Sequence, residues 1–241
     1  MTHGNFANRY RQTGRGLSLV ELMVGIAIGL FIVASASLVV STQLSDNRRL
    51  LLEVQVQQDL RATAEIITRE IRRAGGRDGA AIGVWQGGVG VTANPFDIIT
   101  ITEAGKVVRF DYERGTNLLQ LGFKLDPTRP VIQSFIGTVW QDLTDGNTLR
   151  VTSFTVERAP SPPPPPLPAA DPNIIPCAKA CPAGAHNSCW PRFEARSYII
   201  NISGQAMSDS RVQRSVRSEV RVRNDRITFD ASLPAGQACP I

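Results

Sequence analysis

Four cysteines and one histidine are the residues whose types and spacing could most readily do chemistry in this chain. Cys177, Cys181, His186 and Cys189 share one short stretch, and Cys239 lies near the end. Thiolates and imidazoles bind structural zinc, so a metal loop is one interpretation. The spacing fits zinc fingers poorly, and an even cysteine count in an exported domain favours disulfides. We expect two disulfides and no metal, and among three possible pairings we favour Cys177 with Cys181 and Cys189 with Cys239.

The sequence offers no convincing pair of carboxylates for general acid–base catalysis. Asp142 and Asp145 come closest, but they lie in and beside the turn sequence at 144–147, where aspartate is favoured for backbone reasons alone. The chain has no nucleophile elbow, phosphate loop or HExxH motif. We therefore expect no enzymatic activity and no cofactor.

A basic segment near the C-terminus raises the question of nucleic-acid binding. Charged and apolar residues alternate there, so a strand would carry the charges on one face: Arg217, Glu219, Arg221 and Arg223. No aromatic residues are interleaved to stack bases, which favours a solvated face. The formal charge of +5 falls to 5 − 3 = +2 if the first sixteen residues are removed with Arg9, Arg11 and Arg15. A nucleic-acid partner is not expected.

Glu21 is the most informative residue, because it lies at the edge of a long apolar segment. Residues 22–45 carry no charge, and as a helix rising about 1.5 Å per residue they can cross a bilayer core of about 30 Å. Basic residues precede this segment and none follows immediately, so the N-terminus should stay in the cytoplasm. A carboxylate in a membrane helix costs about 2.5 to 3.5 kcal/mol, so we expect a partner for Glu21. The alternative is a side chain that snorkels to the lipid headgroups.

The residues around Glu21 form a processing motif. An ordinary signal peptide is cut after its apolar run, whereas the small residue here, Gly16, precedes it. The stretch 16–22, GLSLVEL, resembles the type IV prepilin motif. That resemblance implies cleavage after Gly16, methylation of the new N-terminus at Leu17, and pairing of Glu21 with the N-terminal amine of a neighbouring subunit. Two features depart from the usual pattern: Leu17 replaces phenylalanine, and the apolar segment lacks a proline.

A longer resemblance covers about sixty residues and a late segment. Beyond the motif, residues 23–24, 27–31, 60–61, 67–75 and 221–226 are similar to the PilW family of minor pilins. This implies an inner-membrane, single-pass protein with a periplasmic C-terminal domain, which then enters the pilus fibre in a complex that primes assembly or sits at the tip. The implied partners are other minor pilins, the major pilin, the prepilin peptidase/methyltransferase and the inner-membrane assembly platform.

Two alternatives remain open for the function. A J-type pseudopilin of a type II secretion system would share the same long helix and larger β domain. From another class, a membrane-anchored module could bind a surface, DNA or an adhesin through the proline- and cysteine-rich region.

The elements that position these residues begin with one long helix. No proline occurs before Pro95, and residues 17–74 read as a continuous helix that Gly75 and Gly76 end. Its second half carries an apolar stripe with steps of three or four: Leu52, Val56, Leu60, Ala64, Ile67 and Ile71.

The pattern then changes to short β-branched runs separated by turn residues. We expect strands at 97–102, 106–112, 117–123, 131–140, 148–158, 196–203 and 214–223. The fold class is therefore α+β, with a long helix packed by its second half on an antiparallel sheet, as in pilins. The prolines of 159–172 predict a stiff extended spacer, and the alternative is a docking site for a proline-binding module.

These expectations divide the chain into four parts. They are a basic leader at 1–16, a transmembrane and assembly half-helix at 17–45, an amphipathic half-helix at 46–76, and a β-rich periplasmic domain at 77–241 that contains the Pro-rich segment 159–172 and the Cys-rich loop 177–189.

Overall fold

The structure is a computed structural model that describes residues 16, 18–78, 94–115, 117–160, 173–182, 187–230, 233 and 239. The chain forms two compact units, Met1–Leu50 and Leu51–Ile241. The leader up to residue 15, Leu17, most of the Pro-rich segment and His186 lie outside the described residues.

One helix, α1, runs from Leu19 to Arg73 and belongs to both units. The predicted helix is confirmed to within two residues at each end. The predicted end is also confirmed, because Gly75 has a φ of +72°, a conformation that glycine adopts without the strain of a side chain. In the second unit the predicted stripe is buried from Val56 to Ile71, with Leu60, Ile67 and Ile71 fully covered, while Leu52 is partly buried.

A five-stranded antiparallel sheet follows the chain order, so it is a meander. Its strands are β1 (Ile99–Thr102), β2 (Val107–Arg114), β3 (Asn117–Leu125), β4 (Ile132–Ile136) and β5 (Val139–Asp142). A short 3₁₀ turn, η2 (Glu103–Gly105), joins the first two. The single strand predicted at 131–140 is wrong in one respect: Gly137, with a φ of +67°, turns the chain and divides the run into β4 and β5.

A second antiparallel sheet has the order β6-β8-β9, formed by β6 (Leu149–Arg158), β8 (Ser197–Ala206) and β9 (Gln213–Arg221). Two strands of three residues each, β7 (Arg192–Glu194) and β10 (Arg226–Thr228), pair with each other and were not predicted. The prediction of a long helix on antiparallel β structure is confirmed, with the strands divided among separate sheets instead of one.

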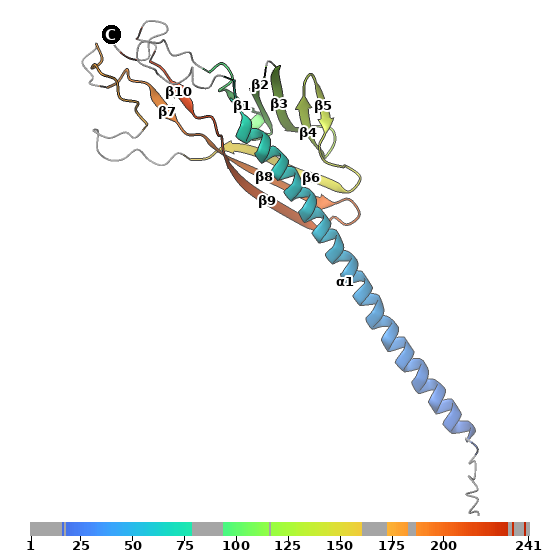
Figure 1. The fold of residues 1–241 in the computed structure, drawn as a ribbon. Helices are drawn as coiled ribbons and strands as arrows, with labels where there is room; N and C mark the ends of the chain where they lie inside the picture. The colour runs from blue at the N-terminus through green and yellow to red at the C-terminus, as the bar shows by residue number, and fades with distance from the viewer. Residues whose placement is uncertain are drawn as a thin grey trace, which may run out of the picture. The chain divides into compact units, whose positions relative to one another are not determined.

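The core of the second unit lies where the helix stripe meets both larger sheets. Figure 1 shows the C-terminal part of α1 running across β6, β8 and β9. Side chains of α1 share one buried cluster with residues of β2, β3, β6 and β8, such as Phe110, Phe123, Phe154 and Ile200. Because these apolar side chains are buried together, the second half of α1 is held against the strands.

Candidate functional site

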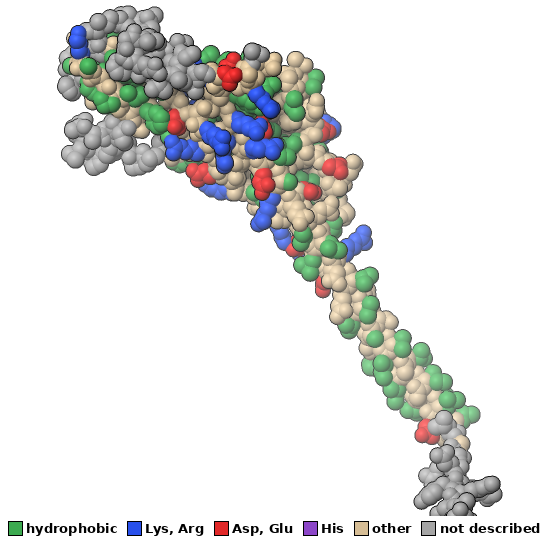
Figure 2. Space-filling model, in the orientation of Figure 1, with side chains coloured by type: hydrophobic (Ala, Val, Ile, Leu, Met, Phe, Trp, Pro, Cys, Tyr) green, Lys and Arg blue, Asp and Glu red, His purple; other side chains and the backbone are tan. Residues whose placement is uncertain are grey.

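The N-terminal half of α1 carries a large uncovered apolar surface. Phe31, Leu19 and Leu38 are 76%, 73% and 71% exposed, and Figure 2 shows hydrophobic side chains all along this half. By length and composition α1 contains a stretch apolar enough to cross a membrane, and none of that stretch is buried in the structure. A helix that is apolar all round needs an apolar environment, which lipid or other helices provide.

Three hydroxyl groups in this half are satisfied by the helix itself. Ser35, Ser37 and Thr42 donate to backbone carbonyls one turn earlier, at 2.5, 2.8 and 2.8 Å. A hydroxyl without a partner would be costly in hydrocarbon, so these bonds lower the cost of placing the three hydroxyls there.

Glu21 is the one ionisable residue among the described residues 18–45. It is exposed and lies in the first turn of α1, whose first backbone bond runs from the Leu22 N–H to the Ser18 carbonyl at 3.0 Å. The unpaired N–H groups of a first turn carry partial positive charge and favour a carboxylate there. Gly16 is exposed just before the helix, and Leu17 lies outside the described residues. The roles of these three residues remain predictions.

The C-terminal end of α1 is held by segments from distant parts of the chain. The last carbonyls of a helix need partners from outside it. Four carbonyls in the last turn of α1 and just after it accept hydrogen bonds at 2.7 to 3.1 Å: Arg72 from the Arg223 N–H, Ala74 from the Asn224 amide, Gly75 from the Asn94 amide and Gly76 from the Glu113 N–H. Residues 67–75 and 221–226, quoted above for the family resemblance, therefore meet here.

A buried arginine connects this region to the start of the first sheet. Arg196 is 4% exposed and donates to the carbonyls of Asp97 and Asn224. The Asp97 carboxylate in turn accepts a bond from Arg226 at 3.0 Å. Sequence reasoning missed these residues, because nothing in the local pattern distinguishes them from solvated charges.

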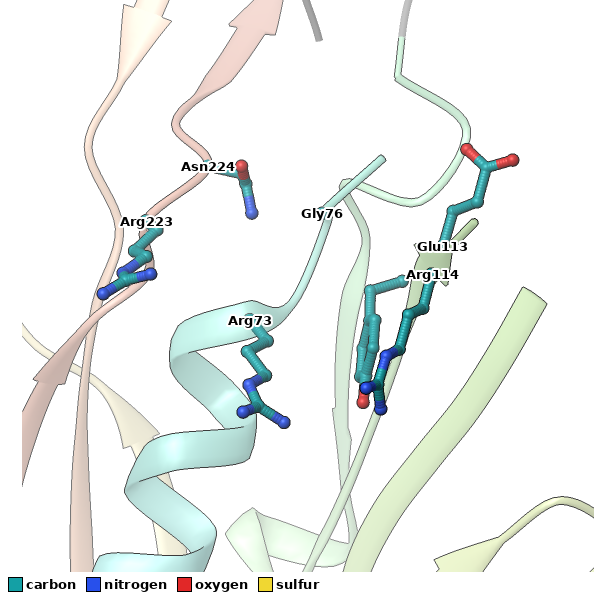
Figure 3. A pocket seen from close by; sticks show the side chains of 7 residues that line it. Arg73, Gly76, Glu113, Arg114, Arg223 and Asn224 are labelled. Atoms are coloured by element: carbon teal, nitrogen blue, oxygen red, sulfur yellow. The ribbon is translucent and has the colours of Figure 1, made fainter. Parts of the chain in front are cut away.

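A pocket of about 430 Å³ lies beside the end of α1, and we call it the arginine pocket. Figure 3 shows Arg73 on the end of α1, with Arg114 on one side of it in the view and Arg223 and Asn224, from the segment beyond β9, on the other. Its lining consists of Arg73, Gly76, Tyr112, Glu113, Arg114, Arg223 and Asn224. Figure 2 shows that Lys and Arg side chains gather on the face of the globular unit drawn there.

The cysteines form two disulfides, as predicted, but the favoured pairing is wrong. Cys177 bonds to Cys239, and Cys181 bonds to Cys189. The Cys177–Cys239 bond joins a residue near the C-terminus to the start of the cysteine-rich loop. The spacing of the cysteines alone did not indicate this pairing. The zinc alternative needs free thiolates, and this pairing leaves none on the four cysteines.

The candidate carboxylates have structural partners. Asp142 accepts bonds from Arg129 at 2.7 and 2.8 Å and from Gln133 at 2.8 Å, and these bonds hold the pKa of its carboxyl below the ordinary value. Asp145 accepts a bond from the Asn147 N–H at 2.9 Å, which is the turn geometry expected from the sequence.

The basic strand has the predicted alternation. Arg217, Glu219 and Arg221 are exposed on β9 and Val220 is buried. Arg223 departs from the prediction, because it lies beyond the end of β9 and its N–H binds the end of α1.

Comparison with known proteins gives one family. The family model described as prepilin peptidase-dependent protein B, PpdB, matches residues 49–222, which is more than half of the chain. Searches of curated proteins and of solved structures each found no match. The match supports a pilin-like protein processed by prepilin peptidase, in a family of generally non-enzymatic structural proteins, and it does not confirm the narrower PilW assignment. This chain belongs to the prepilin peptidase-dependent protein B family and is a type IV pilin-like protein.

Proposed function

We propose that this chain is a minor pilin of the PilW type, cut between Gly16 and Leu17, methylated at the Leu17 amine and built into a pilus by the apolar half of α1. The observation that carries the proposal is this half-helix, uncovered in the structure and interrupted by a single carboxylate at Glu21. On this account residues 1–16 are a leader and 17–45 are the membrane and assembly segment.

Two separate parts of the chain support the proposal. The family match begins at residue 49, whereas the cleavage motif at 16–22 lies before it. The motif and the family match are thus independent signals, and both concern processing by a prepilin peptidase. Agreement between independent segments is stronger support than either segment alone.

The proposed mechanism is exchange of one apolar environment for another. In the inner membrane, lipid covers the apolar half of α1; in the filament, helices of neighbouring subunits replace that lipid, and packing drives association. A charge at the centre of a membrane helix costs about 2.5 to 3.5 kcal/mol, and Glu21, at the edge of the apolar segment, costs up to that amount. Its pairing with a neighbour's N-terminal amine therefore favours the filament and sets the axial register. The complex would prime assembly or occupy the tip with other minor pilins.

Substitution of Glu21 tests this mechanism. Glu21→Gln keeps the size of the side chain and removes the charge, so we expect normal cleavage and membrane insertion. Its amount in sheared filaments should fall by at least about tenfold if an ion pair of about 1.4 kcal/mol or more is lost. Gln43→Ala, in the same exposed segment, is the matched control and should incorporate like the wild type.

Incorporation of Glu21→Gln at the wild-type level would show that the pairing is wrong. A gene deletion that leaves pili intact but stops protein secretion would instead assign the chain to a type II secretion system.

A further inference from the structure

We propose that the arginine pocket is a docking site for carboxylate side chains of another pilus subunit. This inference rests on the proposed function, since it requires a neighbouring subunit. The pocket is built from three segments far apart in the sequence, the end of α1, the end of β2 and the segment after β9. Each segment contributes one arginine: Arg73, Arg114 and Arg223.

The Arg73 side chain is held in position by the carboxylate of Glu70. Its guanidinium lies 3.3 and 3.4 Å from the two carboxylate oxygens of Glu70, whose side chain is 11% exposed. Glu70 also accepts a bond from the Tyr112 hydroxyl at 3.5 Å. About half of the Arg73 side chain remains exposed, at 49%. An arginine oriented by a buried carboxylate loses little further freedom when it binds an anion.

Arg114 and Arg223 supply positive charge that the described part of the chain does not neutralise. Both are exposed, and neither guanidinium has an ion-pair partner among the described residues. Glu113 also lines the pocket, and its carboxylate accepts a bond from the Asp78 N–H at 3.2 Å. Counting Glu70, which pairs with Arg73, three arginines face two carboxylates, so the pocket keeps a positive charge of 3 − 2 = +1, which favours an acidic partner.

The chemistry of the pocket favours protein carboxylates over nucleic acid. Binding of single strands needs exposed rings on which bases stack, but Tyr112, the one aromatic side chain among the described residues that line the pocket, is only 8% exposed. The site is also a single concave pocket, not a stripe that follows a phosphate backbone. Guanidinium groups match carboxylates geometrically, so a loop with adjacent Asp or Glu residues fits this site.

A binding measurement on the purified full-length protein in detergent micelles tests the pocket. The probe is a fluorescently labelled hexaglutamate peptide, followed by anisotropy. The double variant Arg114→Gln/Arg223→Gln should weaken binding by at least about tenfold, as expected for loss of two charge-assisted contacts. Arg217→Gln/Arg221→Gln, at two exposed positions of β9 outside the pocket, removes the same charge as the matched control and should change affinity by less than about twofold.

Several outcomes would overturn the inference. Equal weakening by the pocket variant and the control would mean nonspecific charge attraction. Absence of peptide binding, or tighter and equally arginine-dependent binding of a single-stranded oligonucleotide or of phosphatidylglycerol vesicles, would mean that the pocket does not serve protein carboxylates.

A test in cells separates this inference from the proposed function. A photo-crosslinking residue at position 117 of the full-length chain, which is exposed and pairs with Arg114 in the β2–β3 register, should form crosslinks to an acidic segment of another pilin-like subunit, identified by mass spectrometry. If the wild type enters filaments while these crosslinks are missing and the double variant incorporates normally, the docking site is wrong and the proposed function stands. If the wild type never enters filaments, the proposed function is wrong.

Discussion

The two halves of α1 are one continuous helix, yet they present opposite surfaces. In the first unit Ile32 is 60% exposed, whereas in the second unit Ile67 is fully buried. The first half is apolar on all sides, and the second confines its apolar residues to one stripe that meets the sheets. A stripe can be covered by the chain's own strands, but a helix that is apolar all round needs an apolar environment on every side. The second half thus serves folding, and the first serves the membrane and assembly.

The largest expected effect separates the buried stripe in the second half of α1 from the exposed face of the same half. Ile67→Asp places a charge in the core and should destabilise the globular unit by at least about 4 kcal/mol. Ile66→Asp, next to it and 36% exposed, should cost less than about 1 kcal/mol. Urea unfolding of the full-length protein in micelles, followed by tryptophan fluorescence, measures both. Similar losses at the two positions would contradict the assignment of the buried stripe.

Removal of disulfides should give the next largest effect. Cys177 and Cys239 are 62 residues apart and Cys181 and Cys189 are 8 apart. The chain-entropy model then gives losses of about 4 and about 2.5 kcal/mol for the two double Cys→Ser variants. Urea midpoints of the two variants provide the comparison. A larger loss on removal of the short loop would show that loop closure does not determine their contributions.

Glycine substitutions should have opposite signs in the two halves. Gly75→Ala should cost about 1 to 2 kcal/mol, because its φ is +72° and an added Cβ would lie 3.3 Å from the Phe96 carbonyl oxygen. Gly29→Ala meets open space, so it should favour the helix by up to about 1 kcal/mol. Thermal unfolding followed by circular dichroism distinguishes them, and stabilisation by Gly75→Ala would contradict the described helix end.

The smallest expected effect is on the pH dependence of stability, and it arises from Asp126 in the globular unit. Hydrogen bonds from Thr128 and Arg129 hold the pKa of Asp126 well below its ordinary value. A lowered pKa stabilises the fold above the unfolded value of about 3.9, and that contribution is lost as pH falls below it. Asp126→Asn should therefore unfold at lower urea than the wild type near pH 7, and the difference should shrink below about pH 4. A constant difference across this range would contradict the assignment.

The sequence predicted the elements that depend on local patterns. The stripe in α1 and the strands that became β2, β3, β6, β8 and β9 follow from spacing and β-branched runs. Contacts that depend on tertiary folding were not predictable. β7 and β10 are too short to show a period, and the favoured cysteine pairing was wrong because only the fold brings Cys239 to Cys177. The bonds of Asn94 and Asn224 at the end of α1 arise in the same way, whereas Gly16, Leu17 and Glu21 stay predictions.

The measurement that tests the central claim most directly is the N-terminus of the protein in the filament. Sheared pili should contain this chain, and mass spectrometry should find that it begins with N-methylated Leu17 and lacks residues 1–16. Recovery from filaments of a chain that still carries Met1 to Gly16 would contradict the account.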